Sequence, residues 1–311
     1  MSEYRAPWWL PGGHVQTIVG AFSPVPRVAF TREAWETPDG DFIEVDRAGA
    51  ADAAPLLVLF HGLEGSSQSH YARAIAAEAL LRGWSFALPH FRGCSGKLNR
   101  LPRAYHSGDT DELDWILRRF AERSGPLAAA GVSLGGNVLL KWLGERGAAA
   151  SRLVHRAAAV SAPIDLAAAG NALDRGFNRR TYTRVFLATL LAKAFAKRTL
   201  GHLQFDERRL AKARTLREFD DMITAPLHGF RDTDDYWTRA SSAPWLAKIE
   251  VPTLVLNARN DPFLPAGALE RAAQGAAANV LLEFPRTGGH AGFPGRDRWL
   301  ARRVLDFLCA P

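Results

Sequence analysis

The segment Gly131–Gly135 reads G-V-S-L-G and places Ser133 between two glycines. The apolar run Leu127–Val132 before it is typical of a strand, and Gly135–Arg146 after it is typical of a helix. A sharp strand-to-helix turn strains the backbone, and small flanking residues tolerate it because larger side chains would collide. The turn exposes the hydroxyl near a helix N-terminus, where backbone N–H groups favour negative charge. We expect Ser133 to be a nucleophile; the alternative is an inert serine in a tight turn.

A serine hydroxyl is a poor nucleophile at neutral pH, so it needs a base and a group that orients the base. For a serine in this kind of turn, the acid and then the histidine follow along the chain. Asp261 comes after the apolar run Thr253–Ala258, and His290 comes after Val280–Phe284 in a glycine-rich segment. We therefore expect His290 to take the proton of Ser133 and Asp261 to fix the tautomer of the imidazole.

Both partners also have simpler interpretations. Asp261 precedes Pro262 and could only form a turn, and His290 could be a hydrogen-bonded loop histidine. Three other carboxylates are rival orienters of the base, although no strand carries them to the sheet edge: Asp232, Asp234 and Asp235.

A tetrahedral intermediate on the serine would need two N–H donors for its oxyanion. The first expected donor is the backbone N–H of Leu134, directly after the nucleophile. The second is the backbone N–H of Leu63, in the glycine-containing loop His61–Gly65 after the first buried parallel strand. We expect His61 to support this loop by hydrogen bonding and not to act as a second base.

The stretch His106–Asp111 has the form H-x4-D, a pattern sometimes associated with acyltransferases. It lies just before a predicted helix, so we expect Asp109 or Thr110 to cap the N-terminus of that helix.

The strands and helices that must position these residues follow from hydrophobic periodicity and turn residues. Two segments around a Pro-Asp-Gly turn predict a β-hairpin, Val28–Thr37 and Phe42–Arg47. Further strands are predicted at Leu56–Phe60, Trp84–Leu88, Leu127–Val132, Leu153–Ser161, Thr253–Ala258 and Val280–Phe284. Helices are predicted at Tyr71–Arg82, Asp109–Glu122, Gly135–Arg146 and Arg296–Leu308.

Strands that alternate with helices predict an α/β fold, with a mostly parallel twisted sheet covered by helices on both faces. The 311 residues, 47% of them hydrophobic, suit a single domain over residues 1–311. The alternation breaks between about residues 165 and 240, where the sequence is helical, basic and partly amphipathic. Because this insertion is too long for a loop, we expect a helical cap over the C-terminal edge of the sheet.

Most of the excess positive charge lies in this insertion. The net charge of the chain is +7, and residues 171–217 hold twelve Lys or Arg against three acids. No nucleic-acid recognition motif accompanies them, which argues against a nucleic-acid partner. We expect a solvated basic face, with transient contact to anionic lipid headgroups as the alternative.

The sequence predicts neither a cofactor nor a metal site. Cys94 and Cys309 form no disulfide framework, and the nine histidines are not spaced as metal ligands. No G-x-G-x-x-G fingerprint occurs. There is no signal-peptide architecture and no apolar run of 18 residues, so we expect a cytoplasmic protein.

Several longer strings resemble one branch of the α/β-hydrolase superfamily. They are PGGHVQT from Pro11, HGLEGSSQSHY from His61, FRGCSG from Phe91, YHSGDTDEL from Tyr105, GVSLGGN from Gly131, TLREFDDMITAP from Thr215 and GGHAGF from Gly288. Together they resemble the YheT-type hydrolases, relatives of the eukaryotic ABHD1/ABHD2/ABHD3 group and of yeast enzymes that form medium-chain esters. The resemblance implies an α/β-hydrolase fold and the same roles for Ser133, Asp261 and His290.

The resemblance also implies carboxylesterase or monoacylglycerol-lipase-like activity, with acyl transfer to alcohols in some members. We expect hydrolysis of small short- to medium-chain acyl esters through an acyl-enzyme. The first alternative is an alcohol O-acyltransferase with the same triad, which product partitioning in added ethanol would distinguish. The second is a non-catalytic binding protein on this scaffold. Aromatic residues of the insertion suggest an acyl pocket, namely Phe177, Tyr182, Phe186 and Phe195.

Overall fold

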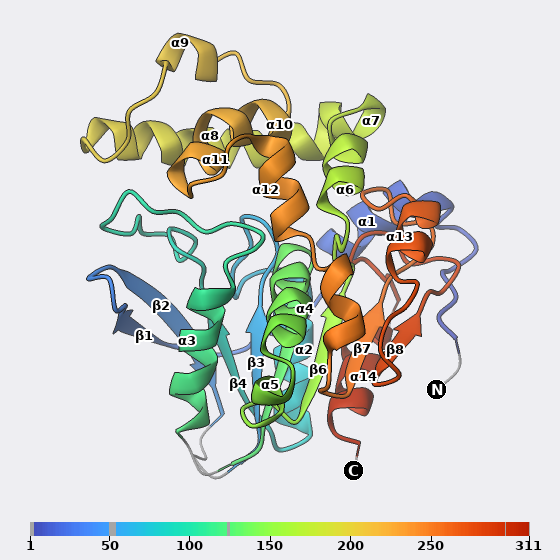
Figure 1. The fold of residues 1–311 in the computed structure, drawn as a ribbon. Helices are drawn as coiled ribbons and strands as arrows, with labels where there is room; N and C mark the ends of the chain where they lie inside the picture. Colours follow the sequence, from blue (N-terminus) through green and yellow to red (C-terminus); the bar gives the residue numbers. More distant parts are fainter. Residues whose placement is uncertain (1–2, 50–53, 123–124, 296, 311) are drawn as a thin grey trace.

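A single twisted sheet with helices on both faces forms the body of the protein (Figure 1). The structure is a computed structural model that describes residues 3–49, 54–122, 125–295 and 297–310. Within these residues the sheet has eight strands in the spatial order β1-β2-β4-β3-β5-β6-β7-β8. Their bounds are β1 Thr31–Glu36, β2 Phe42–Ala48, β3 Leu56–Phe60, β4 Ser85–Pro89, β5 Leu127–Val132, β6 Arg156–Val160, β7 Thr253–Leu256 and β8 Val280–Glu283.

The sheet is parallel except at one edge. Strand β1 pairs with β2, and β2 with β4, in antiparallel register, while every pair from β4 through β8 is parallel. The central strands β3, β4 and β5 are buried along their whole length. Continuous apolar runs suit such strands, because helices cover both faces of a parallel sheet. The predicted α/β class and mostly parallel sheet are confirmed.

Helices α3 and α4 pack in the core on one face of the sheet, and α2 and α14 pack in the core on the other. The helices outside residues 165–240 are α1 Gly12–Phe22, α2 His70–Leu81, α3 Thr110–Ala121, α4 Leu134–Arg146, α5 Ala148–Ser151, the 3-10 helix η3 Ala243–Lys248, α13 Ala266–Ala272 and α14 Trp299–Leu308. Every predicted strand and helix is present, with ends shifted by a few residues. The predicted start of the last helix, Arg296, lies outside the described residues. Four helices were not predicted from the sequence: α1, α5, η3 and α13.

Residues 165–240, called the cap segment below, lie between β6 and β7 in the chain. Their helices gather beyond the edge of the sheet where the parallel strands end (Figure 1). They pack on one another through a cluster of their own that includes Leu187, Leu210 and Phe219. The helices are α6 Leu166–Leu173, α7 Gly176–Asn178, the π-helix η1 Arg179–Thr183, α8 Arg184–Thr199, α9 Glu207–Leu210, α10 Leu216–Phe219, the π-helix η2 Asp220–Thr224, α11 Ala225–Leu227 and α12 Thr233–Ala240.

Two lysines of α8 face inward, unlike the solvated basic face that the sequence predicts. The ammonium of Lys197 is buried and donates to the carbonyl oxygens of three consecutive loop residues, Leu101 (2.8 Å), Pro102 (3.0 Å) and Arg103 (2.8 Å). Lys193 pairs with Glu64 at 2.8 Å. These two side chains attach the cap segment to loops at the strand ends. Among the described residues, no helix is long and apolar enough to span a bilayer.

We predict that Lys197→Met lowers the free energy of unfolding by about 2–3 kcal/mol, since the buried ammonium no longer donates charge-assisted hydrogen bonds to the loop carbonyls. Urea denaturation followed by circular dichroism measures this change. The matched control is Lys212→Met in the same segment, where the side chain is exposed and the change should stay within about 0.5 kcal/mol. Equal denaturation midpoints for the two variants would contradict the proposed attachment.

Candidate active site

The turn between β5 and α4 places Ser133 above the sheet. Its φ is +55°, a left-handed conformation that is strained for any residue with a Cβ. The flanking glycines make the turn possible. A Cβ on Gly131 would lie 2.4 Å from the carbonyl oxygen of Gly135, and a Cβ on Gly135 would lie 2.3 Å from that of Phe60. Because backbone atoms leave no room on either side, this turn requires glycine at both positions.

The structure brings together the three residues that the sequence nominates for proton transfer. The Nε2 atom of His290 lies 3.0 Å from the hydroxyl of Ser133. Its Nδ1 atom lies 2.9 Å and 3.1 Å from the two carboxylate oxygens of Asp261. An ionised carboxylate only accepts hydrogen bonds, so the imidazole proton sits on Nδ1. Nε2 is then free to accept the serine proton, as a general base must.

Buried contacts fix the carboxylate of Asp261. Its side chain is fully buried, and its Oδ1 accepts a hydrogen bond from the backbone N–H of Phe263 at 2.9 Å. The Phe263 ring stacks on the His290 ring with centroids 4.0 Å apart. Asp261 follows β7 and His290 follows β8, so two adjacent parallel strands deliver the acid and the histidine to the same edge.

Helix α1, which the sequence analysis did not predict, holds both of the loops that carry these residues. The side-chain oxygen of Gln16 accepts from the backbone N–H of Gly288 and from the amide of Asn260, each at 2.8 Å. The hydroxyl of Thr17 accepts from the backbone N–H of His290 at 2.8 Å and donates to the carbonyl of Gly13 at 2.7 Å. Gln16 and Thr17 are therefore positioning residues for the acid and the histidine. Both residues belong to the string PGGHVQT, so the sequence did contain a signal for these positioning contacts.

The loop after β3 lies against the serine. A Cβ on Gly62 would stand 3.1 Å from the Cβ of Ser133. Leu63 and Leu134 line the same cavity as the serine, and neither backbone N–H donates to a protein acceptor within the described residues. The arrangement leaves both N–H groups available to an oxyanion.

His61 supports this loop. Its Nε2 accepts from the backbone N–H of Phe91 at 3.0 Å, and its Nδ1 donates to the carbonyl of Gly62 at 2.7 Å. Burial lowers the pKa of His61 to about 3, so the ring stays neutral. With both nitrogens engaged, His61 has no free position for acid–base chemistry.

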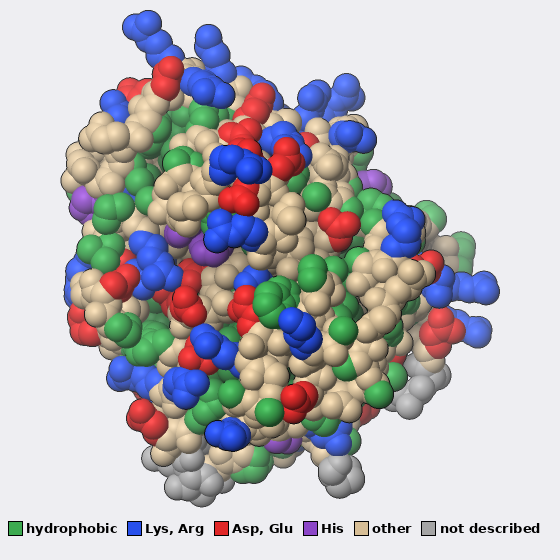
Figure 2. All heavy atoms as spheres, viewed as in Figure 1, with side chains coloured by type: hydrophobic (Ala, Val, Ile, Leu, Met, Phe, Trp, Pro, Cys, Tyr) green, Lys and Arg blue, Asp and Glu red, His purple; other side chains and the backbone are tan. Residues whose placement is uncertain are grey.

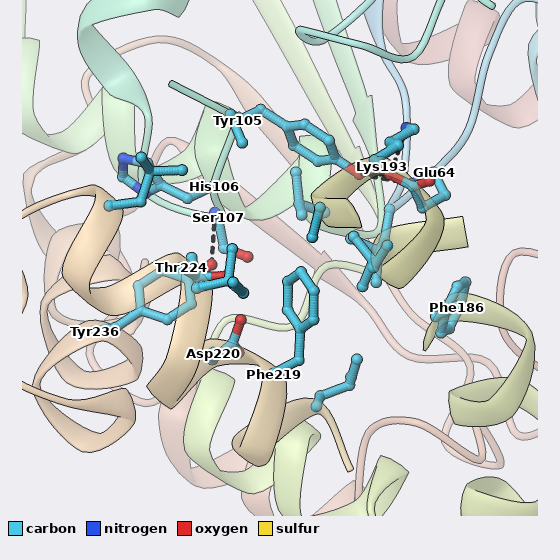
Figure 3. Close-up of a pocket in the computed structure, with 18 of the residues that line it drawn as sticks. Glu64, Tyr105, His106, Ser107, Phe186, Lys193, Phe219, Asp220, Thr224 and Tyr236 are labelled. Atoms are coloured by element: carbon cyan, nitrogen blue, oxygen red, sulfur yellow. Dashed lines mark hydrogen bonds and ion pairs between the residues drawn. The ribbon is translucent and has the colours of Figure 1, made fainter. Parts of the chain in front are cut away.

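A largely apolar cavity of about 150 Å³ opens beside Ser133, between the sheet edge and the cap segment. Its lining includes Leu166, Leu190, Phe219 and Ile223. Of the four aromatic residues that the sequence suggested, Phe186 lines the cavity (Figure 3). The other three lie elsewhere because their helices turn them away: Phe177 is exposed, Tyr182 packs on Phe263, and Phe195 packs on Phe205.

Two carboxylates are among the polar groups that line the cavity. Glu64, next to the proposed oxyanion donor Leu63, accepts from the hydroxyl of Tyr105 at 2.7 Å and pairs with Lys193 (Figure 3). Asp220 lies on another part of the wall, where burial raises the pKa of its carboxyl to about 7. The ion pair between Glu64 and Lys193 thus connects the loop after β3 to the cap segment.

The other sequence candidates take no part in the hydrogen-bonded series of Ser133, His290 and Asp261. Asp109 occupies the predicted N-cap position of α3, but its side chain makes no capping hydrogen bond and pairs instead with Arg103 at 2.6 Å. Asp111 is exposed beside Arg146, whereas His106 lines the cavity (Figure 3) and packs against His228. The rival orienters lie in the cap segment at the start of α12: Asp232, Asp234 and Asp235. No group of three or more His, Cys, Asp or Glu residues in the described ranges is arranged to hold a metal ion.

We predict that Thr17→Val slows the reaction of Ser133 with a fluorophosphonate by about tenfold, because His290 loses its backbone anchor and small misplacements of a base are costly. The labelling rate is measured by quenching the reaction at a series of times, at probe concentrations below and at saturation. Thr17→Ser keeps the hydroxyl and should label at the wild-type rate. Equal rates for the valine and serine variants would show that the hydrogen bond does not position the histidine.

Comparison with known proteins agrees with this geometry. Residues 55–297 match the family model described as alpha/beta hydrolase fold. The chain is 40% identical to a protein named as an esterase, YheT of Escherichia coli (strain K12), over 88% of this chain and 83% of that protein. It is 29% identical to human Phospholipase ABHD3 over 99% of this chain and 79% of that protein.

Among solved structures, the α/β hydrolase GrgF from Penicillium sp. sh18 has the same fold, with a TM-score of 0.62 and 17% identity over 90% of this chain and 98% of that one. The fold, the family match and the relatives lead to one conclusion. The chain belongs to the α/β-hydrolase fold family, in an esterase-type branch that includes YheT and ABHD3.

Proposed function

We propose that this protein hydrolyses short- to medium-chain carboxylic esters through an acyl-enzyme on Ser133, with His290 as the base and Asp261 as its orienter. One observation carries the proposal. The hydrogen-bonded series from Ser133 through His290 to Asp261 ends at an apolar cavity whose wall includes the serine itself. A nucleophile, an aligned base and an apolar site for the acyl group are the parts that ester cleavage needs.

The proposed reaction has two steps. Nε2 of His290 takes the hydroxyl proton as Ser133 attacks the ester carbonyl, and the N–H groups of Leu63 and Leu134 stabilise the oxyanion. The protonated imidazole then gives its proton to the leaving alcohol, and an ester of Ser133 remains. In the second step His290 takes a proton from the water that attacks the acyl-enzyme, and the imidazolium then returns this proton to the Ser133 oxygen as the acid leaves.

The size of the cavity supports a short or medium acyl chain. A dry cavity of about 150 Å³ accepts a molecule of about six carbons, as benzene binding to engineered cavities of this size illustrates. The names of the relatives, an esterase and a phospholipase, support an ester or a lipid-derived ester as substrate. The cap segment supplies most of the cavity lining and would therefore set the preferred chain length.

An alcohol O-acyltransferase would use the same residues and differ only in the acceptor that reaches the acyl-enzyme. A non-catalytic binding protein is less well supported, because its hydrogen-bonded series would serve no purpose. A cytoplasmic location and lipid contact through exposed cations of the cap segment stay predictions.

We predict that Ser133→Ala abolishes fluorophosphonate labelling and lowers the turnover of p-nitrophenyl butyrate at least about 10³-fold, since the remaining site lacks a nucleophile. Steady-state kinetics and gel fluorescence measure both effects. Ser151→Ala, at an exposed serine on α5, serves as the control and should behave as wild type. Ester turnover that survives in Ser133→Ala would exclude the acyl-enzyme.

We predict that Leu190→Trp shifts the preference within a series of p-nitrophenyl esters from hexanoate toward acetate, because the larger side chain fills the cavity. The ratio of kcat/KM values for the two esters should change at least about tenfold. Val185→Trp lies on the same helix α8 with its side chain in solvent and is the matched control. Unchanged chain-length preference in Leu190→Trp would place the acyl group elsewhere.

A further inference from the structure

Helix α1 turns an apolar face toward solvent. Val15, Ile18 and Phe22 are spaced three and four residues apart, so they lie on one side of the helix. All three are exposed, with 84% of the Phe22 surface accessible. Helices on globular proteins usually bury such a stripe, and exposed apolar faces mark interaction sites.

The opposite face of the same helix is small and polar, and it is the buried one. Gln16 and Thr17 hold the loops of the active site, and Gly13 and Gly20 allow close approach of backbone. A Cβ on Gly13 would stand 1.8 Å from the carbonyl oxygen of Asn260, and a Cβ on Gly20 would stand 2.4 Å from Gly292. The polar face of this helix is therefore buried and its apolar face is exposed, because contacts to the loops that carry Asp261 and His290 fix its orientation.

Two exposed indoles lie immediately before this helix in the chain. Trp8 and Trp9 precede α1, with 92% and 59% of their surfaces accessible. Residues 6–26 contain no Asp, Glu, Lys or Arg. Trp is favoured at the boundary between lipid and water because its ring is apolar while its N–H remains hydrated.

Cations border the face where it meets the cap segment. The His14 ring of α1 contacts the exposed Phe177 ring, with centroids 4.5 Å apart. Arg175, Arg179 and Arg180 flank Phe177 in the chain, are exposed, and form no ion pair with any described residue. Figure 2 shows Lys and Arg side chains projecting from the cap-segment edge of the molecule.

We infer that Trp8, Trp9 and the outer face of α1, together with these arginines, form a docking surface for an anionic lipid bilayer. Apolar side chains would enter the headgroup region while the guanidinium groups pair with lipid phosphates. This surface is separate from the cavity beside Ser133. It would also bring the enzyme to lipid substrates, and only this second role rests on the proposed function.

The arrangement favours a lipid surface over a second copy of the chain. In a two-fold interface residue i of one copy faces residue j of the other, so the bordering arginines would face a patch whose residues 6–26 hold no carboxylate to pair with. An anionic surface instead neutralises them. The position is also suited to lipid substrates, since Thr17 on the inner side of α1 binds the backbone of His290.

The inference is tested by co-sedimentation with sucrose-loaded vesicles of phosphatidylcholine alone or mixed equally with phosphatidylglycerol. Wild type and Ser133→Ala should bind the anionic vesicles equally. The double variant Trp8→Ala/Phe22→Ser should bind them at least about tenfold more weakly, which is the loss expected when two inserted rings are removed. Arg179→Gln/Arg180→Gln should lose the preference for anionic vesicles.

Leu81→Ser is the matched control, because this exposed leucine is the last residue of α2 and lies outside the proposed docking surface. It should bind as wild type. Turnover of soluble p-nitrophenyl butyrate should be the same in Trp8→Ala/Phe22→Ser as in wild type, so failure of the ester-hydrolase proposal is recognised separately. Unchanged vesicle binding by that double variant would overturn the inference. The inference would also be overturned if sedimentation velocity showed that the wild type is a dimer, that the double variant is a monomer, and that the wild-type dimer does not bind vesicles.

Discussion

The close approach of bare backbone around Ser133 is the constraint on which the site depends. Gly131 and Gly135 of the serine turn and Gly62 of the loop after β3 bring two chain segments into contact, and none could carry a side chain without displacing its neighbour. The left-handed backbone at Ser133 costs on the order of 1–3 kcal/mol, which the surrounding sheet must supply. Strands β3, β5 and β6 do so by fixing the ends of these segments in register. The hydroxyl therefore has one position, and the other groups are arranged around it.

Those other groups arrive by two different routes. Asp261 and His290 come from the ends of adjacent parallel strands, which is why strand prediction together with chain order was sufficient to nominate them. The parallel strands were predictable because a strand buried on both faces is a continuous apolar run. The β-hairpin was predictable because a Pro-Asp-Gly turn separates its two strands. The proposed oxyanion roles of Leu63 and Leu134 were inferred from their place in the chain, because backbone N–H groups need no special side chain.

The features that the sequence did not predict also have physical explanations. Helix α1 was overlooked because its apolar residues point to solvent and its buried residues are Gly, Gln and Thr, the reverse of the pattern that predicts a surface helix. The capping role assigned to Asp109 failed because Arg103, six residues earlier, folds back to pair with it. Residue type alone could not tell which aromatic side chains of the cap segment face the cavity. That depends on helix rotation, which packing against Phe263 and Phe205 decides.

The contacts of Gln16 and Thr17 span nearly the whole chain, since their partners Gly288 and His290 lie 272 and 273 residues away. Closing so long a loop carries an entropic cost that must be met before such contacts form, and contacts of high sequence separation form late in folding. During synthesis, the first helix and the serine turn emerge well before β8 and the histidine loop. The nascent chain thus carries an unactivated serine until its last strand has joined the sheet. Assembly of the reactive centre thereby reports that the entire domain has folded.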